Sequence, residues 1–177
     1  MSPTEERTEQ GTTRVLNRLS RSARAIHATF ILCAASLIFG ALLRIAWLPA
    51  EAAGFDEWCS LRYLAAPNVI AFLDQSGHPQ DDTIQFMKSA PIFFALEYYW
   101  AMIVDDSIIG IRLLPLFCAI LSIPLFLLVA AHLFSTRVAA LAGWCFAVSQ
   151  IHIYYSLELR PYSMVSLFAL MSMYSFI

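Results

Sequence analysis

The sequence predicts an all-α integral membrane protein, a polytopic helical chain with about four spans. Of its 177 residues, 59% are hydrophobic and only 14% are charged, whereas soluble domains carry about 25% charged residues. The mean hydropathy of +0.66 agrees with this composition. A soluble core of this size could not bury so much apolar surface, but a lipid bilayer could, so composition alone predicts the fold class.

The first span is predicted over residues 25–49, directly after a cluster of four arginines. A run of this length can cross a hydrocarbon core of about 30 Å. It is longer than a usual signal-peptide core and lacks a small-residue cleavage site, so we interpret it as an uncleaved anchor. Because positive residues stay on the cytoplasmic side, residues 1–24 are predicted to form a cytoplasmic tail. The four arginines are Arg14, Arg18, Arg21 and Arg24.

Three later apolar runs predict the remaining spans. Residues 111–134 and 138–156 are each long enough to cross a membrane and are joined by a very short link. The last run, residues 161–177, is still apolar at its end but is shorter than the roughly 20 residues that a span needs. We therefore expect a truncated fourth span, and a chain that is the N-terminal part of a longer protein. The alternative is a natural short product.

The segment Pro91–Val104 is apolar but interrupted by Glu97, and it holds only 14 residues. Runs of this length are more often interfacial than spanning, and aromatic side chains such as Trp100 suit the headgroup zone. We predict a helix lying on the membrane within one long outer loop, residues 50–110. If this segment spanned the membrane instead, Arg137 would lie outside, against the positive-inside rule.

Two adjacent carboxylates, Asp56 and Glu57, follow Gly54 a few residues after the first span. From this position they could reach both a lipid headgroup and water. Such a carboxylate can act as a general base or hold a divalent cation. Taken alone, the pair is more typical of a solvated loop at a helix N-terminus, where acids complement the helix dipole. The dipeptide alone leaves both interpretations open.

A second group of candidates surrounds the predicted outer end of the third span. Glu158 and Arg160 lie there between two apolar runs, flanked by Tyr155 and Tyr162. Charges at membrane depth are costly and usually mark pathways or paired sites. The planar guanidinium of Arg160 could bind a phosphate bidentately. Alternatively, Arg160 snorkels to the interface beside Glu158.

Several other classes of site are not predicted. The sequence contains no CxxC motif and no Cys/His spacing typical of zinc ligands, so neither a disulfide framework nor a zinc site is expected. The arginine cluster adjoins a membrane span and lacks interleaved aromatic residues. No nucleic-acid partner is therefore expected, and the predicted environment is the lipid bilayer.

The order of these segments resembles the multi-spanning C-type glycosyltransferases that use polyprenyl-phosphate sugars. The nearest are bacterial relatives of protein O-mannosyltransferases and of the lipid A aminoarabinose transferase. One departure is that many members carry His-Pro-Pro before the surface helix, whereas this chain has Ser89-Ala90-Pro91. The resemblance rests on the pair Asp56-Glu57, the aromatic-rich segment from Pro91 through Trp100, the motif Arg112-Leu113-Leu114-Pro115, and the stretch Ile153–Tyr162.

The resemblance implies a glycosyltransferase of the bacterial inner membrane that moves a hexosyl or pentosyl group. The donor would be a polyprenyl-phosphate sugar, and the acceptor a glycan, lipid or protein at the outer face. Relatives have many more spans, so the 177-residue chain alone is expected to be inactive. The competing hypothesis is a non-catalytic polytopic membrane protein or a transporter fragment. Transporters usually show internal repeats with broken helices, and the sequence shows no such repeats.

The resemblance also implies roles for individual residues. Asp56 would deprotonate an acceptor hydroxyl or hold an activating metal, with Glu57 beside it in the catalytic group. Glu158 would be a second acid, and Arg160 would neutralise the leaving phosphate. Some relatives need a divalent cation and others do not, so the resemblance leaves the cofactor undecided. The aromatic side chains of Tyr155 and Tyr162 complete the expected substrate-binding group.

Overall fold

The fold was analysed in a computed structural model. It is helical throughout the part of the chain that it describes, with no strand among those residues. The predicted cytoplasmic tail, residues 1–24, lies outside the described part. So do Asp56 and much of the predicted outer loop. The described residues are 27–49, 54, 57, 61, 64, 66–73, 90–104 and 107–177.

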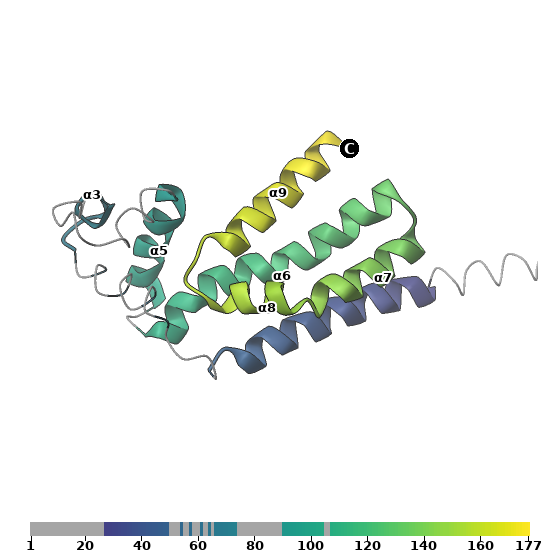
Figure 1. Ribbon diagram of the computed structural model, residues 1–177, viewed down its shortest axis with the longest axis horizontal. Helices are drawn as coiled ribbons and strands as arrows, with labels where there is room; N and C mark the ends of the chain where they lie inside the picture. Colours follow the sequence, from purple (N-terminus) through teal and green to yellow (C-terminus); the bar gives the residue numbers. More distant parts are fainter. Residues whose placement is uncertain are drawn as a thin grey trace, which may run out of the picture.

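Long helices run side by side and form one bundle around α6 (Figure 1). Helix α6 begins where the Ser107 hydroxyl accepts a hydrogen bond from the Gly110 N–H at 3.1 Å, a typical N-cap. It is apolar along its whole length and contacts α5, α7, α8 and α9. The bundle consists of the helix His27–Trp47, α6 (Ile108–Leu133), α7 (Thr136–Ala147), α8 (Gln150–Leu157) and α9 (Tyr162–Phe176).

By length and composition, two of these helices can cross a membrane, namely His27–Trp47 and α6. The bent pair α7–α8 counts as a third span if it is one broken span, whereas α9 and α5 are shorter apolar helices. Large apolar side chains are exposed around the bundle, for example Phe30, Leu42 and Phe168, as expected for surfaces that face lipid. The chain is thus a multi-pass integral membrane protein with two or three of its predicted four spans supported.

The third predicted span, residues 138–156, differs from the expected continuous helix. It is broken into α7 and α8, which meet at an angle of 53°. Helix α7 ends at Ala147, and the Ser149 hydroxyl accepts a hydrogen bond from the His152 N–H at 3.5 Å to start α8. A serine in this position favours a new helix N-terminus over continuation of the old helix.

Small residues bring the first helix, α6 and α7 into close contact. A Cβ atom on Gly40 would lie 2.8 Å from Ile123 Cδ1 and 3.0 Å from Ala147 Cβ, and one on Gly143 would collide with the side chain of Leu127. Such glycines allow membrane helices to approach closely. The close contact matters for the site because it sets the distance between the first helix and the break at Ala147.

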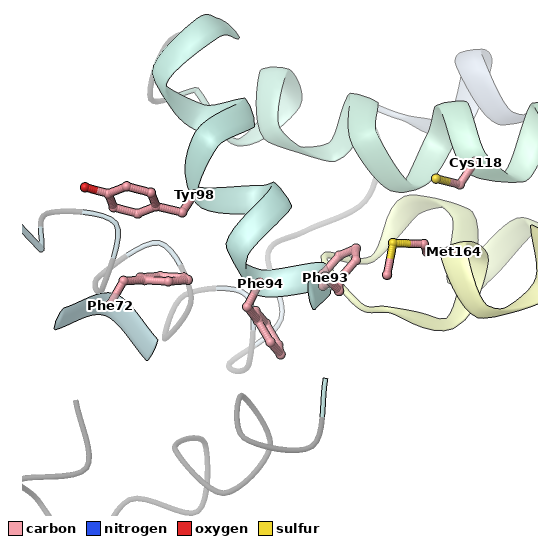
Figure 2. Packing of buried hydrophobic residues seen from close by; sticks show 6 residues of the cluster. All are labelled: Phe72, Phe93, Phe94, Tyr98, Cys118 and Met164. Carbon is pink, nitrogen blue, oxygen red and sulfur yellow. The ribbon is translucent and has the colours of Figure 1, made fainter. Parts of the chain in front are cut away.

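Two helices of the predicted outer loop gather at one end of the bundle (Figure 1). They are α3 (Val69–Leu73) and α5 (Pro91–Val104), and α5 has the bounds expected from the sequence. Figure 2 shows how a buried cluster joins α3 and α5 to the bundle: Phe72 and Tyr98 face each other with ring centroids 5.4 Å apart, and Phe93 points toward Met164 of α9. The α6–α7 link lies at the opposite end (Figure 1).

Candidate functional site

The centre of the site is a buried ion pair between Glu57 and Arg112. The Arg112 Nη2 atom lies 2.6 Å from Glu57 Oε2, and Arg112 Nε donates to Glu57 Oε1 at 3.1 Å. The two residues are only 3% and 1% exposed. The paired N–H groups of the guanidinium therefore engage both carboxylate oxygens in the bidentate arrangement that gives the strongest charge-assisted hydrogen bonds.

Two backbone groups complete the surroundings of the Glu57 carboxylate. Oε2 accepts a hydrogen bond from the Gly54 N–H at 3.1 Å, and Oε1 accepts one from the Leu159 N–H at 2.9 Å. One carboxylate thus joins the segment after the first helix, the first turns of α6, and the connection between α8 and α9. Each oxygen thus already accepts two hydrogen bonds, and the catalytic role of Glu57 expected from the sequence stays a prediction.

The connection between α8 and α9 carries the second group of predicted residues. Glu158 is extended and half-buried, and its carbonyl accepts a hydrogen bond from the Arg160 N–H at 2.8 Å. Leu159 and Arg160 are buried, and burial lowers the pKa of the Arg160 guanidinium below its usual value. Because the Leu159 N–H is held by Glu57, the position of Glu158 and Arg160 depends directly on the ion pair.

The two predicted aromatic residues, Tyr155 and Tyr162, meet across this connection. Their ring centroids lie 4.4 Å apart, and the Ser163 hydroxyl donates to the Tyr155 carbonyl at 2.9 Å. Both rings line a pocket of about 290 Å³ between α8 and α9. The structure therefore brings these two residues together, and Arg160 lies between them in the chain.

No metal site is apparent in the described part of the chain. No group of three or more His, Cys, Asp or Glu side chains among those residues is arranged to hold an ion. Asp56, the residue predicted as a metal ligand or base, lies outside the described residues. Its role therefore stays a prediction, and the sequence leaves the need for a divalent cation undecided.

Arg44, inside the first helix, was not singled out from the sequence. Its side chain is fully buried, and Nη1 donates to the carbonyls of Gly40 at 2.7 Å and of Ala147 at 2.9 Å. Nη2 lies 2.7 Å from His152 Nδ1. Arg44 thus satisfies the last carbonyl of α7, which the break leaves without an intrahelical partner. The sequence signal that could have identified Arg44 is that it is a single arginine within an otherwise apolar span, where charged residues are usually paired or functional.

Glu97 of α5 is a second buried ionisable residue that the sequence did not mark as a site residue. In the sequence it only interrupts the apolar run Pro91–Val104. It is fully buried, and among the described residues neither carboxylate oxygen has a hydrogen-bond partner. Burial, followed by the nearby negative charge of Glu57, raises the pKa of Glu97 to about 8. Glu97 is therefore mostly protonated at neutral pH, which lowers the cost of burying it.

The first prediction concerns the ion pair. Glu57→Gln removes the charge that compensates Arg112, and breaking a buried pair from one side typically costs about 3–5 kcal/mol. We expect a loss of about that size in the free energy of unfolding, measured in mixed detergent micelles. The matched control is Glu158→Gln on a half-buried acid, which should change the value by about 0.5 kcal/mol or less. Equal losses in the two variants would contradict the anchoring role of Glu57.

The second prediction concerns the pH dependence of stability. The pKa of Glu97 is raised from 4.5 to about 8, so the folded state holds this proton more tightly than the unfolded state. The stabilisation is fully present below about pH 4.5 and is lost as the pH rises through about 8. The thermal unfolding midpoint should fall over this range, and Glu97→Gln should flatten the fall. Parallel curves for the two proteins would show that Glu97 does not titrate in this way.

Comparison with known proteins does not assign this chain to a family. No protein-family model, no curated protein and no solved structure matches it. Its function therefore has to be inferred from the residues that the fold brings together.

Proposed function

We propose that the chain functions in a membrane glycosyltransferase, which moves a sugar from a polyprenyl-phosphate carrier to an acceptor at the outer face of a bacterial inner membrane. One observation carries this proposal. The Glu57 carboxylate binds Arg112 and the backbone N–H of Leu159. Three of the motif segments that resemble C-type glycosyltransferases, far apart in the sequence, thus meet at one end of the bundle.

The meeting of these three segments supports the proposal, because a transfer reaction needs its donor, its acceptor and the catalytic groups at one place. Positioning of reacting groups can contribute as much as about 7–11 kcal/mol to lowering a barrier. Here the Asp56-Glu57 pair is tied through Glu57 to the connection that carries Glu158 and Arg160. In the proposed site Glu57 is a positioning residue, and the acid that acts on the acceptor is its neighbour Asp56.

In the proposed reaction every bond that forms or breaks, the proton and the leaving group are accounted for by the donor, the acceptor and the residues of this chain. The acceptor hydroxyl oxygen attacks the anomeric carbon of the sugar, and the bond from that carbon to the phosphate oxygen breaks. The hydroxyl proton passes to Asp56, and the carrier phosphate leaves with the bonding electrons. Arg160 neutralises the charge that develops on this phosphate, an effect worth most where water is excluded. A divalent cation held by Asp56 would assist by polarising the acceptor oxygen.

The buried setting of Arg160 suits this role. The residue is 9% exposed and lies two positions before Tyr162 in the chain. A guanidinium with few waters around it attracts a phosphate more strongly than an exposed one, because the local dielectric is low. The tyrosine pair next to it offers flat apolar faces and two hydroxyls to a sugar or an isoprenoid unit. Glu158, half-buried on the same connection, is the second acid of the proposed site.

The break between α7 and α8 is the feature that favours the transporter hypothesis. Transporters bind substrates at discontinuous helices, usually in pairs related by internal repeats. Within the described ranges only one bent pair occurs, α7–α8. Arg44 satisfies the Ala147 carbonyl at this break. The contact with Arg44 accounts for the break without a transported substrate. The meeting of three motif segments at Glu57 therefore favours the transferase over the transporter.

The third prediction tests donor recognition in the purified chain, reconstituted in lipid nanodiscs. A diazirine derivative of undecaprenyl phosphate should label the protein, and unmodified undecaprenyl phosphate should compete. Arg160→Ala should reduce labelling about 10-fold, which corresponds to about 1.4 kcal/mol of lost binding. Arg137→Ala is the matched control, because Arg137 is exposed in the first turn of α7, and the α6–α7 link lies at the opposite end of the bundle (Figure 1).

Asp56→Asn should leave this labelling unchanged, since Asp56 is proposed to act on the acceptor and not on the carrier. In a full-length parent protein that carries this segment and transfers sugar, the same change should lower turnover about 10²–10⁴-fold, as expected for loss of a general base. Equal labelling of the Arg160→Ala and Arg137→Ala proteins, or labelling that undecaprenyl phosphate does not displace, would overturn the proposed function.

A further inference from the structure

A groove opens between the first helix, α6 and α7, near the end of the bundle that carries the α6–α7 link. It measures about 520 Å³, within the range of about 300–1,000 Å³ that is usual for ligand sites. Figure 1 shows that the first helix begins at this end of the bundle, away from α3 and α5. The groove is therefore separate from the site around Glu57.

Small side chains leave this space open. Next to the groove, the helices pack tightly where Gly40 and Gly143 allow close contact. Toward the α6–α7 link, an alanine from each of the three helices lines the groove, and side chains of this size do not fill the space between the helices. The lining of an empty space loses dispersion contacts, so an apolar molecule from the membrane gains contacts by filling it. The alanines are Ala34 of the first helix, Ala131 of α6 and Ala139 of α7.

The depth of the groove matches one leaflet of a bilayer. Its lining runs from Thr29 to Leu37 along the first helix and from Pro124 to Ala131 along α6. At about 1.5 Å per residue these stretches are about 10–12 Å long, close to half of a hydrocarbon core of about 30 Å. A lipid acyl chain lies within one leaflet, whereas a spanning helix contacts both. The groove therefore fits an acyl chain better than a helix of a second copy or of another protein.

The groove has a polar end and an apolar remainder. Thr29 and Thr136 line it near the beginnings of the first helix and α7, and the rest of its lining is apolar. Hydroxyl groups can donate hydrogen bonds to phosphate and ester oxygens. A phospholipid needs this arrangement, because its polar headgroup and its acyl chain are joined at the membrane surface.

The charge of the adjoining sequence favours an anionic headgroup. Four arginines, at positions 14–24, precede the first helix, and no Asp or Glu occurs in residues 11–50 or 107–157. Clusters of about four to eight Lys or Arg beside a membrane helix attract anionic lipid headgroups. Arg137 follows Thr136 in the chain but does not line the groove. The arginine cluster before the first helix therefore supplies the charge.

We propose that this groove binds an anionic diacyl phospholipid. One acyl chain lies between the first helix, α6 and α7, and the phosphate lies at Thr29 and Thr136. The arginine cluster is close to this position, because Arg24 is three residues before His27, where the first helix begins. The lipid fills space that the side chains leave open and joins the three helices at this end. This binding does not depend on the proposed sugar transfer.

The test uses the purified chain in phosphatidylcholine nanodiscs that contain a trace of a lipid with a diazirine in one acyl chain. The probe is phosphatidylglycerol, and the control probe is zwitterionic phosphatidylcholine with the same chains. Labelled peptides are identified by mass spectrometry after photolysis. The phosphatidylglycerol probe should label residues 29–37 and 124–139 about 5-fold or more above the control probe, because the arginines attract its headgroup. Raising the salt concentration should reduce this preference by screening the attraction.

Two variants fill the groove from different helices. Ala131→Phe and Ala34→Phe should each lower the labelling of the groove about 5-fold or more, because a phenyl ring takes the place of the acyl chain against the lining. Ala169→Phe is the matched control, because Ala169 is exposed on α9 and does not line the groove, and its labelling should equal that of the wild type. Unfolding midpoints in mixed micelles identify a variant that loses labelling because it misfolds.

A further variant leaves the apolar groove intact and tests the headgroup. Replacing Arg21 and Arg24 by glutamine should reduce the preference for phosphatidylglycerol about 2-fold or more. Labelling by the phosphatidylcholine probe should not fall. This result would separate the attraction of the headgroup from the fit of the acyl chain, and it does not require any change in the packing of the helices.

Four results would overturn the inference. They are equal labelling of the groove by the two probes, labelling of the groove no stronger than that of the exposed face of α9, full labelling in both Ala131→Phe and Ala34→Phe, and an unchanged preference after replacement of the two arginines. A disulfide that joins two chains through Cys33, which lines the groove, together with loss of labelling, would assign the groove to a second copy and would also overturn it. None of these measurements uses undecaprenyl phosphate, so their failure leaves the proposed transferase function standing.

Discussion

The described structure depends on one carboxylate, that of Glu57, because it is the point where three separate stretches of chain are held together. A bundle of apolar helices in lipid gains little from the hydrophobic effect when its helices associate, since lipid tails are as apolar as leucine. Directional polar contacts therefore have to specify how the ends of the helices meet. Glu57 does this at the outer-loop end by binding Arg112 and the backbone N–H groups of Gly54 and Leu159. The desolvation cost of the pair is offset only while all these contacts are made together.

A second polar contact performs the same task inside the bundle. Arg44 reaches across to the Ala147 carbonyl and to His152, and the close approach at Gly40 makes this reach possible. The break between α7 and α8 is therefore supported from a different helix. It turns α8 so that Tyr155 meets Tyr162 at 4.4 Å between ring centroids. The buried side chain of Arg44 thus links the first helix to both sides of this break.

The sequence predicted the local features well and the distant ones poorly. Hydropathy placed α6 within three residues of its observed start, and the length and aromatic content of Pro91–Val104 predicted α5. The break after Ala147 was missed because residues 138–156 read as one apolar run, and its partner Arg44 is 103 residues away in the chain. The Asp56-Glu57 pair was singled out from the sequence, but the contacts of Glu57 were not. The anchoring of Glu57 could not be predicted, because it depends on the position of Arg112, 55 residues further on in the chain.

A double-mutant cycle on Glu57 and Arg112 tests the central claim most directly. The free energy of unfolding would be measured in mixed micelles for Glu57→Gln, Arg112→Gln, the double variant and the wild type. If the pair is the anchor, each single change removes one member of the buried ion pair, and the double variant should lose less than the sum of the two losses by about 1.5–3 kcal/mol. Additive losses would mean that the two side chains act independently, and that the convergence of the three segments is held by something other than this ion pair.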